Sequence, residues 1–464
     1  MVPRVPRVRG ASPGAARRFL KDRMKKGFYW IMAAQFFSSL ADNALLIAAI
    51  ALLVQLSSPG WMTPLLKFFF TVSYVLLGPF VGGFSDSLQK GHVMLITNLV
   101  KLGGLLLMLF GAHPLWAYAV VGLGAAAYSP AKYGILTELL PPQQLVAANG
   151  WIEGTTVGSI ILGTVLGGFL VSRDAASWLL SLQPLRMLHV DTQAGAALAM
   201  IALVYVVAAL CNLRIPDTGA RYPHQTANPV RQLLEFGQGM RVLWSDRLGQ
   251  ISMAVTTLFW GAGATLQFIV IKWAESALGL DLSNAAVLQA TVAFGVALGA
   301  MLAASRVPLK NSLRVLPVGM AMGVMCIVVA LYTRGVVPDL QFAVGRLHVP
   351  LYLLLAGMFM VAIGAMAGYF VVPMNALLQH RGYVLLSAGH SIAVQNFNEN
   401  LSVLAMLGMY SLLIGWNLSV RTTMLLFGAF IVLSMWLVMR WNAHNMRQRD
   451  WTQLIGEARH SAQG

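Results

Sequence analysis

The stretch FFSSLADNALLIAAIALLVQ, residues 36–55, decides the fold class of this chain. It is apolar and long enough to cross a bilayer, which takes about 20 mostly apolar residues. Asp42 and Asn43 nevertheless interrupt it near its middle. A charge at the bilayer centre costs about 2.5–3.5 kcal/mol on insertion scales, and such residues face the protein interior. The stretch therefore predicts a membrane helix whose polar face is turned toward other helices.

The composition also indicates a membrane protein. Hydrophobic residues make up 58% of the 464 residues and charged residues only 10%, whereas soluble domains carry about 25% charged residues. The net charge of +16 does not indicate nucleic acid, because the basic residues gather in an N-terminal leader, a central connector and the C-terminal tail. Lysines and arginines in such segments mark the cytoplasmic side of a membrane protein.

Hydropathy predicts about twelve membrane-spanning helices. We place them at 29–56, 65–85, 92–111, 115–138, 148–171, 193–213, 250–276, 284–304, 312–333, 350–376, 388–415 and 421–441. The longest polar stretch, 214–249, separates the sixth span from the seventh. The sequence therefore predicts an all-α membrane protein with two six-helix halves.

This division gives five segments. They are a basic leader at 1–26, an N-terminal half at 27–213, a connector at 214–249, a C-terminal half at 250–441 and a tail at 442–464. The leader is rich in Arg, Pro, Gly and Ala, and we expect it to be disordered. An even number of spans places both termini and the connector on one side, and their basic residues make that side the cytoplasm.

Two stretches suggest that the halves repeat one another. They are YSPAKYGILTELLPPQQLVAANGWIEG at 128–154 and VVPMNALLQHRGYVLLSAGHSIAVQN at 371–396. Each has a proline late in a predicted helix, Pro130 or Pro373, and a polar residue two positions later, Lys132 or Asn375. Helix breakers at matching positions of two halves indicate the substrate path of a transporter. A coincidental likeness between two loops is the alternative.

Polar residues in the first and eleventh spans are the main candidates for substrate binding. Gln35, Ser38, Ser39 and Asp42 form a stripe with helical spacing, which favours a cavity lining over a structural ion pair. In the eleventh span Asn396, Glu399 and Asn400 share one face, and Gln395 lies beside Glu399. Hydrogen bonding between helices is the alternative for the amides, but it does not explain a carboxylate.

Other polar residues leave more than one interpretation open. Tyr128 and Lys132 could hold a phosphate or a carboxylate, or Lys132 could extend to the membrane interface. Glu153 could bind substrate or stabilise a helix N-terminus. Gln267 in the seventh span is deep enough to line a cavity, whereas Lys272 lies near the outer end. Lys101 could pair with a buried carboxylate or extend to the interface.

A second group of charged residues lies at the predicted cytoplasmic ends of the spans. Asp86 and Lys90 lie in GGFSDSLQKGHVM at 82–94, and Glu138 and Arg381 end the fourth and tenth spans. Exchangeable ion pairs among these four could close one end of the protein and release it in another state. Solvation of loop residues is the alternative.

Enzyme, metal and ATP-driven functions lack their usual signals. The sequence has no P-loop or nucleophile elbow in a suitable context, and Cys211 and Cys326 lie in apolar runs without metal-ligand spacing. We therefore expect neither an enzyme nor a metal or cofactor site, and predict a secondary or passive transporter.

The same motifs carry a resemblance to a known family. The two-half design with GGFSDSLQKGHVM resembles the major facilitator superfamily, although the spacing from Asp86 to Gly91 is one residue longer than in its usual loop motif. More narrowly, the part of the chain from about residue 25 to about residue 441 resembles the bacterial lysophospholipid transporter family. The stretches that carry this resemblance are ADNALL, GAAAYSPAKYGIL, ANGWIEG, TLFWGAG, VVPMNALLQHRG and AGHSIAVQNFNEN.

The resemblance implies a transporter of the Gram-negative inner membrane. It would move 2-acyl-glycerophosphoethanolamine, and also lysophosphatidylglycerol, from the outer to the cytoplasmic leaflet without obligatory ATP. A partner acyltransferase/acyl-carrier-protein synthetase would reacylate the product there. A proton-coupled drug or metabolite exporter of the same superfamily is the alternative, and a lipid-modifying membrane enzyme is a rival from another class.

The resemblance also implies site residues. Asp42, Asn43, Lys132, Glu153, Asn396 and Glu399 fall on matching motifs, whereas Gln267 stands where the family carries an arginine. In the resulting hypothesis Asp42 and Glu399, one from each half, attract the ethanolamine ammonium of the substrate. Lys132, with Asn43 and Gln267, accepts the phosphate and the glycerol hydroxyl. The remaining candidates for the cavity are Tyr128, Asn375, Gln395 and Asn400.

Overall fold

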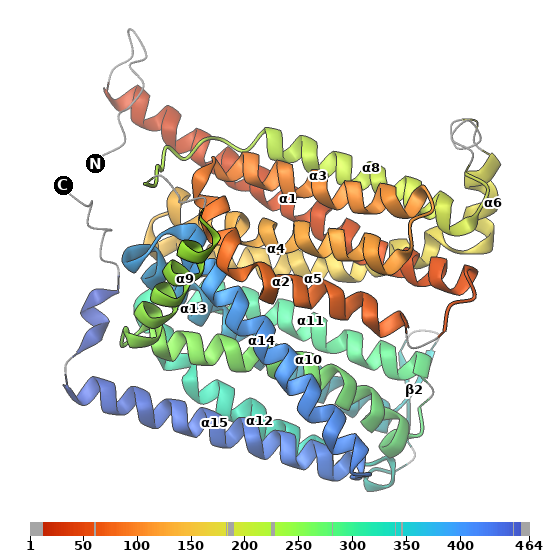
Figure 1. Cartoon of the computed structure of the whole chain (residues 1–464). Helices are drawn as coiled ribbons and strands as arrows, with labels where there is room; N and C mark the ends of the chain where they lie inside the picture. Colours follow the sequence, from red (N-terminus) through yellow and green to blue (C-terminus); the bar gives the residue numbers. More distant parts are fainter. Residues whose placement is uncertain are drawn as a thin grey trace.

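A computed structural model gives the arrangement of the chain (Figure 1). It describes residues 13–59, 62–181, 183, 190–223, 228–280, 282–338, 340–344, 347–448 and 450–455. Long helices dominate these residues and run side by side as one bundle. The predicted all-α membrane architecture is confirmed, with one small β-hairpin in addition.

The helices before the connector are α1 (Pro13–Gln55), α2 (Met62–Ser87), α3 (Lys90–Leu109), α4 (Pro114–Leu139), α5 (Leu145–Leu170), α6 (Arg173–Ser181) and α8 (Gln193–Leu213). The connector contains α9 (Pro229–Ser245). The later helices are α10 (Gly249–Leu278), α11 (Leu282–Arg306), α12 (Leu316–Leu331), α13 (Leu351–Leu385), α14 (Ala388–Gly415) and α15 (Val420–Gln448). Short 3₁₀ turns precede α5 and α12 and follow α12 and α15.

Eleven helices among the described residues are long and apolar enough to cross a membrane. The fourth predicted span, 115–138, is the one not among these eleven; it corresponds to α4, which is 26 residues long and packs against α2, α3 and α14. Helices suit this environment because each backbone N–H and C=O is satisfied within its own segment. Pro79, Pro130 and Pro373 lie inside α2, α4 and α13, where neighbouring helices can satisfy the freed backbone groups.

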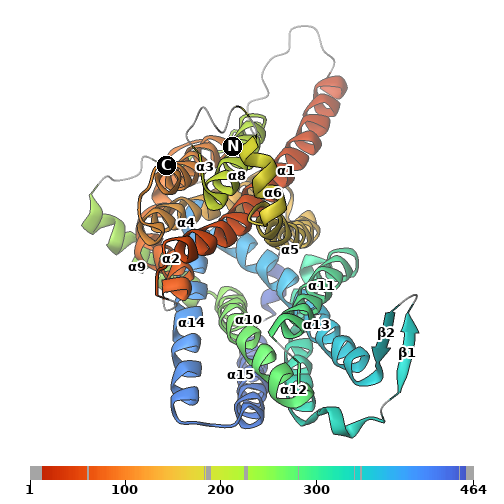
Figure 2. The ribbon, with the colours of Figure 1, turned by 90° about the vertical axis from the view of Figure 1, so that its right-hand side faces the viewer.

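The helices pack mainly with others from the same part of the chain. The helices before the connector form the first group, in which α1 packs against α5 and α8, and α3 packs against α4 and α8. The helices after the connector form the second group, in which α11 packs against α13, and α12 packs against α15. Figure 2 shows α1, α3, α4 and α5 together in its upper part and α10, α12, α13 and α15 in its lower part. The two groups meet where α14 lies against α2 and α4, and where α5 lies against α11 and α13.

Glycines allow α11 and α13 to pack unusually closely. An added Cβ on Gly295 or Gly299 would collide with the backbone of α13, and one on Gly364 or Gly368 would collide with that of α11. Each helix carries its two glycines four residues apart, on one face. Small residues at this spacing let membrane helices approach through their backbones, where van der Waals contact replaces the missing hydrophobic driving force.

The segments outside the predicted halves are partly helical. Residues 1–12 and 456–464 lie outside the described part, and α1 begins at Pro13, inside the segment 1–26 for which a disordered leader stays a prediction. Alanine, leucine and lysine in this part favour helix, and proline is well suited to the first helical turn. The tail continues α15 to Gln448 and adds a 3₁₀ turn at Trp451–Leu454.

A β-hairpin between α12 and α13 was not predicted. Strands β1 (Gln341–Val344) and β2 (Leu347–Pro350) pair antiparallel, with Gln341 opposite Pro350 and Val344 opposite Leu347. The hairpin lies at the end of the bundle opposite α9 (Figure 1). The end with α9 is called the α9 end below.

Candidate functional site

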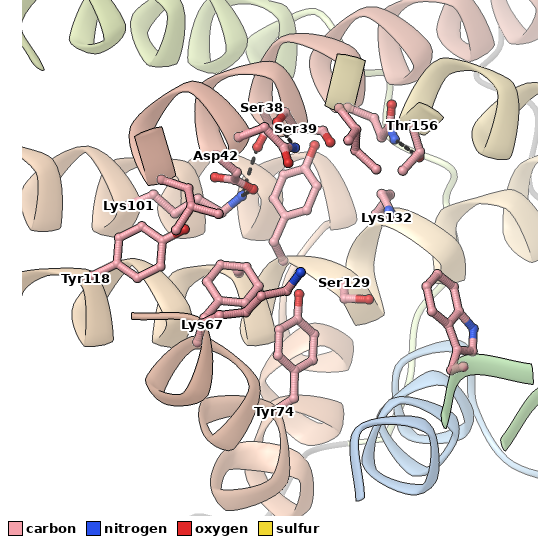
Figure 3. Close-up of a pocket in the computed structure, with 18 residues that line it drawn as sticks. Ser38, Ser39, Asp42, Lys67, Tyr74, Lys101, Tyr118, Ser129, Lys132 and Thr156 are labelled. Atoms are coloured by element: carbon pink, nitrogen blue, oxygen red, sulfur yellow. Dashed lines mark hydrogen bonds and ion pairs between the residues drawn. The ribbon is translucent and has the colours of Figure 1, made fainter. Parts of the chain in front are cut away.

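A cavity of about 310 Å³ lies within the first group of helices (Figure 3). Helices α1 to α5 supply its walls, and α10 contributes one side chain, Trp260. The lining residues are Gln35, Ser38, Ser39, Asp42, Asn43, Leu46, Lys67, Phe70, Tyr74, Lys101, Tyr118, Ala125, Tyr128, Ser129, Lys132, Thr156, Ile160 and Trp260. The stripe on α1 that helical spacing predicted therefore faces this cavity.

Asp42 is bound by side chains of the protein itself. Lys101 Nζ lies 2.8 Å from Asp42 Oδ2 and also donates to Ser38 at 2.9 Å. The Tyr205 hydroxyl donates to Asp42 Oδ1 at 2.6 Å. Lys101 is 1% exposed, so the Asp42 carboxylate is the counter-charge of a buried ammonium. Of the two alternatives for Lys101, the structure shows the pairing with a buried carboxylate. Asp42 is therefore not an uncompensated anion in the cavity.

Lys132 lies in the cavity without an anionic contact. Its Nζ is 4.2 Å from the centre of the Tyr133 ring, whereas the Tyr128 ring lies under Lys101 at 4.6 Å. The pairing of Lys132 with Tyr128 that i, i+4 spacing suggested is therefore replaced by a contact with the adjacent ring. Among the described residues, Lys132 makes no hydrogen bond or ion pair.

The polar cluster of the eleventh predicted span is hydrogen bonded within α14 and to neighbouring helices, and it does not line this cavity. In α14, Gln395 donates to Glu399 at 2.7 Å and to Asn375 of α13 at 3.1 Å. Asn396 donates to Ser129 of α4 at 2.9 Å, and Asn400 donates to the carbonyl of Asn396. These contacts match the alternative of hydrogen bonding between helices.

Two further candidates also lie off the lining. Neither Glu153 nor Gln267 belongs to it, and Asn43, which does, donates to the Ser39 carbonyl at 2.8 Å. The cavity therefore has no carboxylate from the C-terminal half. In this structure Lys101 pairs with Asp42 and Glu399 is not part of the lining, so joint binding of the ethanolamine ammonium by Asp42 and Glu399 stays a prediction.

At the α9 end, Asp86 joins α2 to the start of α14. Its carboxylate accepts hydrogen bonds from Lys90 Nζ at 2.6 Å and from the backbone N–H groups of Gly389 at 2.9 Å and His390 at 3.3 Å. The Ser387 hydroxyl also donates to it. A helix N-terminus presents free N–H groups and a positive dipole end, which favour an anion. Asp86 is therefore a charged contact between the two groups of helices.

Glu138 extends this cluster to the connector. Its two oxygens accept hydrogen bonds from Thr218 and Tyr222, each at 2.7 Å, and Lys90 Nζ lies 3.7 Å away. Burial and the nearby Glu138 carboxylate raise the pKa of Tyr222, so its hydroxyl keeps its proton and donates. Asp86, Lys90 and Glu138 are thus brought together as expected.

Arg381 does not join that cluster. It donates two hydrogen bonds to Asp246, the C-cap residue that follows α9, at 2.7 and 3.1 Å. The expected exchange of partners with Asp86 or Glu138 is therefore not seen, because Asp246 is a nearer carboxylate and accepts the guanidinium at both oxygens. A neighbouring neutral contact links the groups of helices, since Asn149 of α5 and Gln379 of α13 exchange hydrogen bonds at 2.8 and 2.9 Å.

The model of the Major Facilitator Superfamily matches residues 31–402 of the chain. The chain belongs to this superfamily. Among its relatives within this superfamily are two proteins named lysophospholipid transporter LplT. That of Yersinia enterocolitica is 42% identical over 396 residues, covering 85% of this chain and 89% of its own length. That of Yersinia pestis strain Pestoides F is 42% identical over 395 residues, covering 85% and 88%.

Solved structures of other transporters have the same fold. The transporter FucP in its outward conformation aligns with a TM-score of 0.65 over 89% of this chain and 98% of its own, at 13% identity. A bacterial homologue of the iron transporter ferroportin, in an outward-facing state, gives 0.64 over 90% and 99%, also at 13% identity. At this identity the likeness concerns the fold alone.

Sequence reasoning missed several cavity residues of this superfamily member. Lys67 and Tyr74 both come from α2, and Thr156 accepts a hydrogen bond from Gln35 at 2.5 Å. Lys67, Phe70 and Tyr74 lie at i, i+3 and i+7, which places them on one helical face. This spacing was the available signal, but a lysine near the start of an apolar helix usually extends to the membrane interface.

Proposed function

We propose that this chain transports lysophospholipids, with 2-acyl-glycerophosphoethanolamine and lysophosphatidylglycerol as substrates. The observation that carries the proposal is the 42% identity, over most of both chains, to proteins named lysophospholipid transporters. The cavity is compatible with it, because cationic and hydroxyl side chains of the lining suit a phosphodiester and a glycerol. Because the relatives described above are named transporters, we infer that the chain moves its substrate without changing it chemically.

The size of the cavity suggests how the lipid is held. About 310 Å³ is at the lower end of the range of small-molecule sites, which is about 300–1,000 Å³. It suits a polar headgroup better than a whole lipid with its acyl chain. The headgroup would occupy the cavity against Lys132 and the α1 stripe, while the acyl chain stays in apolar surroundings beside Leu46, Phe70 and Ile160.

Transport would proceed by alternating access. In the proposed cycle the two groups of helices rock about the cavity, and the contacts of Asp86 with α14 close the α9 end in one state and release in the other. The basic leader, connector and tail support cytoplasmic termini in the inner membrane. We propose movement from the outer to the cytoplasmic leaflet, where an acyltransferase/acyl-carrier-protein synthetase would consume the product.

Uptake of labelled lysophosphatidylethanolamine tests the proposal. Spheroplasts of a host without its own lysolipid uptake would carry the wild-type chain, an empty vector, or Lys132→Met at equal protein level. We expect uptake with the wild type, none with the vector and a clear loss with Lys132→Met. Chromatography of the recovered label separates translocation from chemical conversion. Wild-type uptake no greater than the vector's, or efflux that depends on a proton gradient, would instead favour the exporter.

A further inference from the structure

Lys67 is the cavity lysine that has no opposing charge. It lies near the start of α2, lines the cavity and points toward the Tyr74 hydroxyl (Figure 3). The residue is exposed at the cavity wall, and among the residues that the structure describes it makes no hydrogen bond or ion pair. An ammonium with three donors and no acceptor held at a cavity wall is a ready contact for an anion.

Each of the other charged residues of the lining has an opposite charge nearby. Lys101 and Asp42 neutralise one another at 2.8 Å. Lys132 has no direct partner, but Glu153 and Glu399 are close enough to act on it electrostatically. Of the three lysines of the lining, Lys67 is therefore the one without a carboxylate close to it, and a bound phosphate would balance its charge. The lining offers no equivalent uncompensated carboxylate for an ammonium.

Lys67 and Lys132 lie at different depths. Lys67 is 19 residues before Asp86 on α2, or about 28 Å at 1.5 Å per residue, whereas Lys132 is six residues before Glu138 on α4, or about 9 Å. Asp86 and Glu138 both contact Lys90 at the α9 end. Lys67 is therefore the lysine farther from the α9 end. A ligand that enters the cavity from the opposite end meets Lys67 before Lys132.

We propose that Lys67 contacts the phosphate of the lysophospholipid headgroup and is a substrate-binding residue of the cavity, with Tyr74 on the same helical face. This inference rests on the proposed function for the identity of the ligand. It assigns headgroup recognition to the phosphodiester, which both proposed substrates share. The ammonium of the ethanolamine substrate has no dedicated partner in the cavity.

Binding measurements with purified full-length protein in nanodiscs test this assignment. Labelled lysophosphatidylethanolamine would be bound to the wild type, Lys67→Met, Lys67→Arg and Lys272→Met. Lys272 is a suitable control, because it is a lysine of α10 outside the cavity, paired with Glu275 at 2.9 Å. We expect Lys67→Met to bind about tenfold more weakly, as for loss of one charge-assisted contact, while Lys67→Arg and Lys272→Met stay within about twofold of the wild type.

A histidine variant separates charge from side-chain shape within one protein. The imidazole of Lys67→His is protonated below its ordinary pKa of about 6.5 and neutral above it. We expect the affinity of Lys67→His, relative to the wild type at the same pH, to fall as the pH rises from 5.5 to 8. A misfolded variant would be weak at both pH values, and its thermal unfolding would show it.

The outcomes distinguish this inference from the proposed function. If the wild type binds and transports the lysolipid but Lys67→Met binds equally well, or if the relative affinity of Lys67→His does not change with pH, the assignment of Lys67 is wrong and the transport function stands. If the wild type itself neither binds nor transports the lysolipid, the proposed function fails.

Discussion

Asp42 shows how a single charged residue can be retained in a membrane helix. Its carboxylate has a lysine on one oxygen and a tyrosine hydroxyl on the other, from α3 and α8 respectively. Breaking a buried ion pair by removing one partner costs about 3–5 kcal/mol, because the other charge stays buried, whereas replacing both partners is often tolerated. The Asp42 side chain is 19% exposed toward the cavity, so the cost of losing it should fall at the lower end of that range.

A double-mutant cycle tests this account of Asp42. We expect Asp42→Asn and Lys101→Met each to lower the unfolding temperature of the purified protein, and the double variant to be more stable than the sum of the single losses predicts. The coupling arises because the double variant leaves no buried charge without its partner. Thermal unfolding followed by tryptophan fluorescence measures it. Additive losses would show that the pair does not hold α1 and α3 together.

At the scale of a helix, the N-terminus of α14 depends on a residue of α2. Gly389 and Gly82 permit this contact, because a Cβ on Gly389 would lie 2.6 Å from Asp86 Oδ1 and 2.7 Å from the Gly82 carbonyl oxygen. Real Cβ atoms do not approach other atoms so closely, so one helix would have to move. The backbone N–H of Gly389 would then lose its place on the Asp86 carboxylate.

Gly389→Ala should therefore weaken closure of the α9 end. We expect reduced lysolipid uptake at equal protein level, together with a lower unfolding temperature, since the added methyl group separates α2 from α14. Gly408→Ala is the matched control in the same helix, because its Cβ would meet nothing within 4 Å and alanine favours helix over glycine. Equal behaviour of the two variants would contradict the role of close packing at Gly389.

Over the whole molecule, the sequence predicted the fold better than the site. Apolar runs of about 20 residues identify spans regardless of how they pack, so the helical architecture could be read directly. Helical spacing also predicted that Gln35, Ser38, Ser39 and Asp42 share a face. It could not show which lysine reaches Asp42, because Lys101 lies 59 residues away on α3. Nor could it show that Glu399 is bonded within its own half, since that depends on helix rotation.

The two groups of helices are held together at the α9 end by contacts that alternating access would have to break. Asn149 and Gln379 are 0% and 1% exposed, and their reciprocal hydrogen bonds join α5 to α13. A neutral amide pair suits a contact that opens and closes, because separating it leaves no buried charge. The Asp86 contacts with α14 lie at the same end and would open with it.

Cross-linking this pair should stop transport. In a background without Cys211 and Cys326, the only cysteines of the chain, Asn149→Cys and Gln379→Cys would be joined by a short bifunctional methanethiosulfonate. We expect lysolipid uptake to be lost on cross-linking and restored by a reductant, because the bridge holds α5 against α13. Lysolipid binding should persist, since the cavity lining contains neither residue.

Cysteines at Lys272 and Glu275, one turn apart on α10, provide a control cross-link within a single helix that should leave uptake unchanged. Full uptake by protein whose α5–α13 bridge is verified by mass spectrometry would show that this end need not open.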